Sequence, residues 1–427
     1  GGARGQVGTW GQADGTPGGG AETGDVPSVE VMPLPPTHPS RRHRDMSAAV
    51  SVSLRPAAPT AGAVLDIDLS AVGANTRRFA ALTPALLAVV KADGYGLGAT
   101  QIARTALSHG AIGLGVTSLA EALALRADGL TAPILSWLNP VDGDFAAGLA
   151  AGVHLAVGSI EHLDAVCRAA RHTGRAASVH LAVDCGMARD GSPPLAWPAL
   201  CARAGQAQQS GLVDVVGVMG QLSHAGRPRH AASQRGRAVF DWAVTTAAGH
   251  GLAPEHRHLA TTAACLTDPR SMHTMSRVGA GLVGVDPSST TLLAQVVTLR
   301  APVVAVRDVV AGTGVGYGHT WRAKRATRLV TVPVGYADGI PRGAAGRAEV
   351  SVGGHRCPVV GGVNMDQTVI DVGRLEIELG EPVVVLGGEG PTLVEWAEWA
   401  QTLPHEILTG LGGRVARRYS GVSRDQR

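Results

Sequence analysis

Lys91 is the residue of this chain best suited to covalent chemistry. It follows the apolar run "LLAVV" and precedes "ADGYGLGAT", which brings three glycines close to the lysine. Lys324 is the only other lysine, so arginine carries almost all of the positive charge. A lysine amine can lose its proton and then form a Schiff base or accept a proton, whereas a guanidinium cannot. An isolated lysine in an arginine-rich chain therefore favours a reactive amine over an ordinary surface charge.

The elements that would position Lys91 recur along the chain. Apolar runs alternate with alanine-rich segments of helical period, such as "SLAEALALRADGL" and "SIEHLDAVCRAARHTG", in which a serine before an acidic residue marks a helix start. The eight runs cover residues 86–91, 112–118, 132–139, 153–159, 178–186, 215–223, 256–263 and 277–285. Eight β/α units predict a closed (β/α)8 barrel over residues 61–293 and not an open doubly wound sheet. Lys91 ends the first run, and barrel active sites lie at the carboxyl ends of the strands, so we expect its amine at the barrel mouth.

The chain changes character after about residue 294. Valine-rich alternating runs broken by glycine turns, such as "ATRLVTVPVGYADG" and "AEVSVGGHRCPVVGG", replace the helical segments. They predict a mainly antiparallel β domain over residues 294–427. The expected fold class is therefore α/β, with a barrel followed by a β domain.

The composition excludes several classes of function. The 427 residues are 45% apolar, and Lys plus Arg number 37 against 34 for Asp plus Glu, with the basic residues scattered. We therefore expect no nucleic-acid-binding face, no membrane association and a small molecule as the substrate. Five cysteines without a CxxC pair, and no histidine cluster at metal-ligand spacing, predict free thiols in the cytoplasm and no metal site.

Residues 1–60 differ from the rest of the chain. They are rich in Gly, Pro, Ala, Ser and Arg without a sustained period, so we expect them to be disordered. The pair Arg41-Arg42 could suggest an export signal, but no apolar segment of the right kind follows it. We expect translation to start near Met46, and the preceding residues to carry no function.

The segment "VVKADGYGLGA" resembles the cofactor-lysine motif of the alanine racemases. These enzymes use pyridoxal 5'-phosphate and consist of an N-terminal eight-stranded barrel and a C-terminal β domain. The resemblance continues from about residue 63 to 420 in the family's order and spacing. It implies that Lys91 binds the cofactor as a Schiff base and later, as a free amine, takes or returns the substrate's α-proton on one face. It also implies that the phenol of Tyr95 bonds the cofactor phosphate.

Other barrel segments are similar to the rest of the family's cofactor site. In "VDCGMARDG", Arg189 corresponds to the arginine that reaches the cofactor's phenolic oxygen and the substrate carboxylate, to which a planar fork is suited. In "HLATTAACLTDP", Thr262 stands where a serine hydroxyl usually meets the phosphate. In "SRVGAGLVGVDPS", Arg277 corresponds to the arginine that faces the pyridine nitrogen. The resemblance assigns the remaining phosphate contacts to the backbone amides of Gly279 and Ala280.

The β domain resembles the part of the family that completes the site. "GVGYGHTW" is similar to the motif whose tyrosine, here Tyr317, is the second base, delivered from one subunit of a homodimer into the partner's barrel. In "GGVNMDQTVID", the backbone amide of Met365 would bind the substrate carboxylate, and Asp366 would line the entrance. Tyr336 and Arg342, in "VGYADGIPR", would support the same entrance.

The resemblance implies an enzyme that interconverts L-alanine and D-alanine and supplies D-alanine for peptidoglycan. Lys91 would act on one face of the substrate and Tyr317 on the other. Arg277 cannot accept a proton, so it should leave the pyridine nitrogen neutral and the carbanion short-lived, which suits a racemase. A fold-related amino-acid decarboxylase would need an acidic residue at this position.

Three departures from the family leave alternatives open. Gln221 replaces a histidine that stacks on the cofactor ring, and His224 would substitute for it only if the sixth strand slips or bulges. Ala182 replaces a lysine, often carbamylated, that orients the equivalent of Arg189. Gly413 replaces a tyrosine that closes over the phosphate in some members. The alternatives are a slow racemase, a racemase of broader specificity acting on serine or another small amino acid, and a cofactor-binding relative without turnover.

Overall fold

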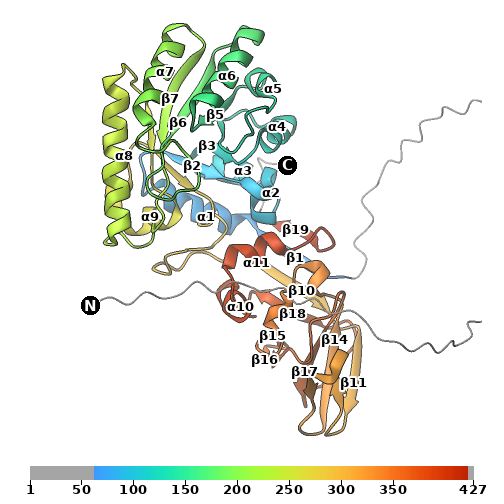
Figure 1. Cartoon of the computed structure of the whole chain (residues 1–427). Coiled ribbons are helices and arrows are strands. Elements are labelled where there is room, and N and C mark those ends of the chain that lie inside the picture. Colours follow the sequence, from blue (N-terminus) through green and yellow to red (C-terminus); the bar gives the residue numbers. More distant parts are fainter. Residues whose placement is uncertain (1–61, 422–427) are drawn as a thin grey trace, which may run out of the picture. The chain divides into compact units, whose positions relative to one another are not determined.

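The computed structural model describes residues 62–421. The expectations about residues 1–60 and about Met46 lie outside this range. Within it, a barrel of strands and helices is followed by a region rich in β-strands, as Figure 1 shows. No helix between residues 62 and 421 is long and apolar enough to cross a membrane.

Eight parallel strands form the barrel, and each overlaps one of the eight apolar runs of the sequence. They are β2 (Leu86–Val89), β3 (Ala111–Val116), β4 (Ile134–Ser136), β5 (Val153–Val157), β6 (Ala177–Ala182), β7 (Val213–Met219), β8 (His256–His258) and β9 (Ser276–Val278). The sheet runs from β8 back through β7 to β2 and then to β9. A bridge between Thr261 and Arg277 joins its two ends. The predicted (β/α)8 barrel is therefore confirmed.

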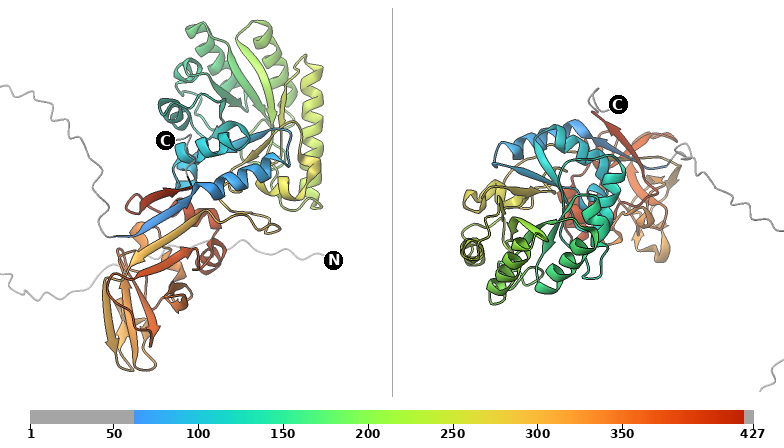
Figure 2. Two further views of the ribbon diagram at one scale, coloured as in Figure 1. Left: turned by 180° about the vertical axis from the view of Figure 1, so that it is seen from behind. Right: turned by 90° about the horizontal axis from the view of Figure 1, so that it is seen from above.

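Helices surround the strands of the barrel, as Figure 2 shows. They are α1 (Leu69–Ala80), α3 (Ala99–Ser108), α4 (Leu119–Ala127), α5 (Phe145–Ala150), α6 (Ile160–Thr173), α7 (Trp197–Gln209), α8 (Ala231–Gly249) and α9 (Thr262–Thr267). The two serines that mark helix starts in the sequence cap α4 and α6. The hydroxyl of Ser118 accepts the backbone N–H of Glu121, and that of Ser159 accepts the backbone N–H of His162. Each bond satisfies a backbone donor that the first helical turn leaves without a partner.

Apolar side chains fill the space on both sides of the barrel strands. Between strands and helices, Trp197 and Phe240 are fully buried, and the indole N–H of Trp197 donates to the carbonyl of Ala243 at 2.9 Å, which ties α7 to α8. A separate apolar cluster contains Leu87, Leu135, Met219 and Met275. Because these four residues come from different parts of the ring of strands, their packing fixes the strands relative to one another.

The second region is the mainly antiparallel β domain that the sequence predicts. Its strands are β1 (Val64–Asp68), β10 (Val297–Pro302), β11 (Ala305–Val309), β12 (Gly314–Val315), β13 (Trp321–Arg322), β14 (Thr327–Val332), β15 (Glu349–Val352), β16 (His355–Pro358), β17 (Thr368–Gly373), β18 (Pro382–Gly387) and β19 (Ala416–Ser420). One sheet has the order β16-β15-β18-β10-β1-β19, a second β11-β14-β17, and β12 pairs with β13. Two helices, α10 (Leu393–Ala400) and α11 (Pro404–Gly410), lie between β18 and β19 in the chain.

The first strand belongs to the β domain, although it precedes the barrel in the sequence. β1 is antiparallel to β10, with Leu65 opposite Leu299, and parallel to β19. A barrel domain beginning at residue 61 therefore includes a strand that lies in the other sheet. The difference arises because the backbone partners of β1 are β10 and β19, which the chain reaches only after the barrel, and not β2.

Candidate active site

A cavity of about 890 Å³ opens at the carboxyl ends of the barrel strands. Its walls include all eight residues that the sequence predicts for cofactor binding: Lys91, Tyr95, Arg189, Gln221, Thr262, Arg277, Gly279 and Ala280. The volume lies within the range of about 300–1,000 Å³ that is usual for small-molecule sites. Residues spread over almost two hundred positions of sequence thus meet at one place.

The four residues after Lys91 form a left-handed turn. Within α2 (Lys91–Gly96), their φ angles lie between 52° and 62° and their ψ angles between 36° and 50°. At about 1–2 kcal/mol for each non-glycine residue, Ala92, Asp93 and Tyr95 together cost about 3–6 kcal/mol in this conformation. Such a turn persists only where the surrounding structure holds it. It lets Lys91 and Tyr95, four residues apart, both reach the cavity.

Glu121 holds the turn in place. One oxygen of its carboxylate accepts the backbone N–H of Ala92 at 2.7 Å, and the other accepts the N–H groups of Thr117 and Ser118 at 2.9 and 3.1 Å. Burial raises the pKa of Glu121, but the hydrogen bonds from Thr117, Ala92 and Ser118 outweigh burial and lower the pKa below its usual value. The sequence marks Glu121 as part of a helix start, but its bond to the turn depends on the fold.

The β domain also contacts the turn. The guanidinium of Arg417 donates to the carbonyl of Gly96 at 3.1 and 3.3 Å. His405 and Thr409, on successive turns of α11, line the cavity. Burial and the neighbouring Lys91 lower the pKa of His405, and its buried Nδ1 has no hydrogen-bond partner among the residues that the structure describes. The motif assignments did not include His405, which the structure adds to the site.

The surroundings of Lys91 favour its neutral amine. Burial lowers the pKa of Lys91, the positive charge of Arg189 lowers it further, and Arg277 acts in the same direction. The carboxylate of Glu121 opposes these effects without cancelling them. A larger fraction of Lys91 is therefore unprotonated at a given pH than for an exposed lysine, which is the state that can act as a nucleophile or base.

Tyr95, the last residue of the left-handed turn, is in close contact with Gly279. A β-carbon at Gly279 would lie 2.2 Å from the hydroxyl oxygen of Tyr95, so only glycine fits. Burial raises the pKa of Tyr95 to about 12, although a hydrogen bond from the Ala280 backbone opposes it, so the hydroxyl keeps its proton. The hydroxyl of Thr262 accepts the backbone N–H of Gly281 at 3.2 Å and keeps its own proton to donate. This wall of the cavity therefore offers several hydrogen-bond donors.

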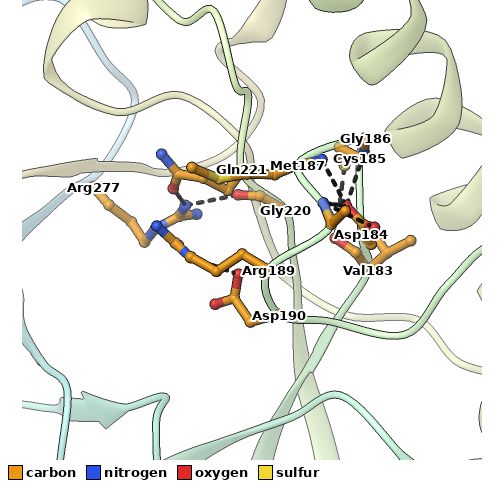
Figure 3. Close-up of polar contacts among 11 residues, drawn as sticks. Val183, Asp184, Cys185, Gly186, Met187, Arg189, Asp190, Gly220, Gln221 and Arg277 are labelled. Atoms are coloured by element: carbon orange, nitrogen blue, oxygen red, sulfur yellow. Dashed lines mark hydrogen bonds and ion pairs between the residues drawn. The ribbon is translucent and has the colours of Figure 1, made fainter. Parts of the chain in front are cut away.

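Arg277 is almost fully buried, with 5% of its surface exposed. Its guanidinium donates to the carbonyls of His258 and Gly220 at 2.6 and 2.7 Å and to the side-chain oxygen of Gln221 at 2.9 Å, as Figure 3 shows for the last two. Burial lowers its pKa to about 10, so it remains protonated at neutral pH. All of these acceptors are uncharged, so the positive charge of Arg277 is not neutralised by them.

Gln221, and not His224, lies beside Arg277. Strand β7 does contain a bulge, at Val216, where its pairing with β6 shifts by one residue. The bulge does not bring His224 to Arg277, because Gln221 makes the bond described above. The ring of His224 lines the cavity but stacks on His230, with ring centroids 3.9 Å apart. The alternative of His224 as a substitute for Gln221 is therefore not supported.

Asp190 supplies the carboxylate that faces Arg189. The Nε of Arg189 donates to Asp190 at 3.1 Å, and Figure 3 shows the arginine side chain extending past Asp190 toward Arg277. Ala182, at the end of β6 before this loop, has no charged side chain. The carboxylate of Asp184 is used within the loop itself, where it accepts the backbone N–H groups of residues 186 to 188. The resemblance to the family indicates that a lysine is missing at residue 182, but it does not predict that Asp190 contacts Arg189.

The residues predicted from the β domain form a separate group. Tyr317, Met365 and Tyr336 have 86%, 53% and 43% of their surface exposed. The backbone N–H of Tyr336 donates to the carbonyl of Asn364 at 2.9 Å, so Tyr336 and Met365 lie on adjoining segments. Within the residues described, this group does not line the cavity of its own chain. Exposed large side chains on adjoining segments, here Tyr336 and Met365, are typical of a surface that meets another molecule.

Arg342 and Asp366 lie in the same domain. Arg342 begins a short 3-10 helix, Arg342–Ala344. Asp366 accepts the Nη1 of Arg414 at 2.7 Å, and the Nε of Arg414 donates to Asp338 at 2.9 Å. These ion pairs join the segment of Met365 to the start of β19.

Two family models match almost the whole described chain. They are the alanine racemase N-terminal domain, over residues 67–287, and the alanine racemase C-terminal domain, over residues 296–419. The chain is 40% identical over 364 residues to an alanine racemase of Mycobacterium tuberculosis, which covers 83% of this chain and 94% of that protein. It is 41% identical over 367 residues to an alanine racemase of Frankia casuarinae, with 84% and 95% covered.

Solved structures agree with the sequence matches. The alanine racemase of a D-cycloserine-producing Streptomyces lavendulae has a TM-score of 0.84 and 38% identity, covering 86% of this chain and 99% of that one. The alanine racemase of Bartonella henselae with covalently bound pyridoxal phosphate has a TM-score of 0.77 and 27% identity, with 84% and 100% covered. Sequence, fold and the cavity at the barrel mouth lead to one conclusion: the chain belongs to the alanine racemase family of isomerases.

Proposed function

We propose that this protein interconverts L-alanine and D-alanine with pyridoxal 5'-phosphate as its cofactor. The observation that supports it most strongly is the position of the Lys91 amine, which lies in a cavity beside two arginines that lower its pKa. D-alanine produced in this way would enter peptidoglycan. We expect the reaction to take place in the cytoplasm, since all five cysteines are buried free thiols, the state that a reducing compartment maintains.

The cavity fits each part of this cofactor. The amine of Lys91 would bind its aldehyde carbon, and Arg277 would face its pyridine nitrogen. The phosphate would lie against the Tyr95 and Thr262 hydroxyls, at the wall where only a glycine fits at residue 279. Arg189 would bind the phenolic oxygen. When bound, the cofactor supplies an electron sink for the negative charge that develops at the substrate's α-carbon.

Two residues of the chain would move the proton at that carbon. In one direction the neutral amine of Lys91 takes the proton on one face, and the hydroxyl of Tyr317 donates a proton on the opposite face. In the other direction the phenolate of Tyr317 takes the proton, and the protonated amine of Lys91 donates one. Arg277 keeps a positive charge in the site without exchanging a proton, because a guanidinium only donates hydrogen bonds.

Tyr317 would act in the cavity of a second copy of the chain. Its side chain is 86% exposed, and it lies in a domain whose predicted site residues do not line the cavity of the same chain among the residues described. We infer a homodimer in which each subunit completes the other's site. The backbone amide of Met365 would then help Arg189 to bind the substrate carboxylate, while Tyr336, Arg342 and Asp366 would line the entrance.

A racemase of broader specificity, acting on serine or another small amino acid, is the second possibility. The replacement of a tyrosine by Gly413 gives it no structural support, because Gly413 is exposed and does not line the cavity. A cofactor-binding protein without turnover is a further alternative, and the same experiment separates all three.

The test is incubation of the purified protein and cofactor with L-alanine in heavy water. Racemisation gives D-alanine with deuterium at the α-carbon. Tyr317→Phe should slow proton removal from one enantiomer more than from the other, and Lys91→Ala should abolish both. Exchange without inversion, or binding without exchange, would contradict the proposed function, and a faster reaction with serine would favour the second possibility.

A further inference from the structure

Three histidines form a row of hydrogen bonds that starts at Arg277 and crosses the barrel interior. Nη1 of Arg277 lies 3.1 Å from Nδ1 of His258. Nε2 of His258 lies 2.9 Å from Nδ1 of His180, and Nε2 of His180 lies 3.2 Å from Nδ1 of His154. These residues come from β8, β6 and β5. We call His258, His180 and His154 the histidine chain.

Arg277 fixes the direction of every bond in the histidine chain. Because a guanidinium only donates, Nδ1 of His258 must accept, and the proton of this neutral imidazole is on Nε2. That N–H donates to Nδ1 of His180, so the proton of His180 is also on Nε2. The same argument makes Nδ1 of His154 an acceptor. One tautomer is therefore imposed on the whole chain.

The environment keeps the imidazoles neutral. His258 and His180 have 0% and 2% of their surface exposed, and burial lowers the pKa of each well below 6.5. Arg277 and His256 lower both further. His154 is only partly buried; burial also lowers its pKa, helped by His256 and by Arg126 on α4 and opposed by Asp214 on β7.

The barrel is shaped to admit these rings. Gly217 lies opposite His180 in the pairing of β6 with β7, and a β-carbon at residue 217 would lie 2.0 Å from Nδ1 of His180. His256 stacks on His180 with ring centroids 5.9 Å apart and planes at 5°. The row is not a metal site, since residues 62–421 contain no group of three or more His, Cys, Asp or Glu side chains that could hold a metal ion. The ring nitrogens of the three histidines bond to one another.

We propose that the histidine chain positions Arg277 through hydrogen bonds of one fixed direction, and that it does so without neutralising the charge of the arginine. A carboxylate in the place of His258 would orient the guanidinium equally well but would form an ion pair with it. A neutral imidazole leaves the positive charge available to the cavity, where it lowers the pKa of Lys91. His180 and His154 are therefore positioning residues that act through His258. The hydrogen-bond pattern is a property of the protein itself, and only its effect on turnover rests on the proposed function.

The direct test is nuclear magnetic resonance of the full chain, loaded with pyridoxal 5'-phosphate and labelled with 15N-histidine. Two-bond proton–nitrogen spectra report which ring nitrogen carries the proton, and His258→Gln and His180→Gln assign the signals. We expect Nε2–H tautomers for the histidine chain, and no titration of its two fully buried members between about pH 5.5 and 8.5. A proton on Nδ1 of His258 or His180, or an ordinary titration of either, would overturn the proposal.

Variants test the positioning role. His180→Leu cuts the chain, and Gly217→Ala displaces the ring while keeping all three histidines. Both should lower kcat by about 10-fold to 100-fold, as a small misplacement of a site residue does, with a smaller change in KM. Both should also shift the Nε2–H resonance of His258, whose acceptor is lost or displaced, while Arg277 keeps that proton on Nε2. His180→Gln, which can accept and donate, should restore part of kcat. His256→Gln, the matched control, removes a ring that stacks on His180 but takes no part in the row of hydrogen bonds, and it should change neither measurement.

The outcomes separate this inference from the proposed function. If wild-type protein shows the predicted tautomers but no racemisation, the histidine chain stands and the proposed function fails. If racemisation occurs and His180→Leu leaves both kcat and the His258 Nε2–H resonance unchanged, the positioning role is wrong. Should His180→Leu fail to fold, the wild-type spectrum and Gly217→Ala decide the question.

Discussion

Replacing Gly279 with alanine should damage the phosphate wall of the cavity in a measurable and specific way. The added β-carbon would lie 2.2 Å from the Tyr95 hydroxyl oxygen and 2.9 Å from two ring carbons. Residue 279 is not in the left-handed region of the backbone, so alanine costs nothing through its dihedral angles. Overpacking costs about 1–3 kcal/mol, and loss of the hydrogen bond from Ala280 to Tyr95 about 0.5–1.5 kcal/mol. We expect a loss of about 2–4 kcal/mol in the free energy of unfolding.

The same substitution should weaken cofactor binding through the phosphate. Displacing the Tyr95 hydroxyl removes one hydrogen bond to a charged group, worth about 1.5–3 kcal/mol, so the Kd of pyridoxal 5'-phosphate should rise about 10-fold to 100-fold. Pyridoxal, which lacks the phosphate, should bind with an almost unchanged Kd. Urea unfolding of the cofactor-free protein and spectroscopic titration with both ligands, at one protein concentration, supply the two measurements.

A double-mutant cycle identifies the contact responsible. Tyr95→Phe removes the hydroxyl oxygen, which is the nearest atom, so the cost of Gly279→Ala should be smaller by about 1 kcal/mol or more in that background. Gly249→Ala is the control, because a β-carbon there meets no atom within 4 Å. Additive costs in the cycle, or an equal loss of affinity for pyridoxal and its phosphate, would refute the reasoning.

Three further predictions concern charge. Glu121→Gln should loosen the strained turn and, by removing a negative charge, lower the pKa of Lys91 further. Competitive acetylation read by mass spectrometry measures the reactivity of the Lys91 amine relative to that of exposed Lys324, the only other lysine. Asp190→Asn should raise the KM for alanine several-fold more than it lowers kcat, because it frees the side chain of Arg189; an unchanged KM would show that Asp190 does not orient the arginine. The two fully buried members of the histidine chain stay neutral when folded, whereas the unfolded chain protonates them below about pH 6.5. Each should therefore lower the free energy of unfolding by about 1.4 kcal/mol per pH unit below that value, and urea unfolding at pH 8 and pH 5.5 should show a smaller loss in the histidine-to-glutamine variants.

The sequence predicts the barrel well because its signal is repeated. Eight apolar runs, each followed by a helical segment, leave few architectures open, and each run overlaps a strand. The sequence does not show that β1 lies outside the barrel, because its five residues directly precede α1 and resemble another β/α unit. Its partners, β10 and β19, are more than two hundred residues away in the chain. Strand pairing over such a separation cannot be recognised from the neighbouring sequence.

The candidate site divides in a similar way. Lys91 is visible in the sequence because lysine is rare here, and motifs carry the other residues of the cavity wall. Glu121 and Asp190 are not visible, because ordinary sequence reading assigns a helix start to one and a surface charge to the other. Their roles depend on which backbone groups and side chains the fold brings near them. The left-handed turn is likewise hidden, since neither alanine nor tyrosine favours it.

The pairing of β1 with β19 has a consequence for synthesis of the chain. β1 leaves the ribosome before any barrel strand, yet its neighbours in the sheet are complete only when residues 297–302 and 416–420 have been made. The barrel strands can associate while both edges of β1 are still unpaired. Residues 416–420 therefore complete this sheet, and their deletion should expose the edge of β1 and promote aggregation.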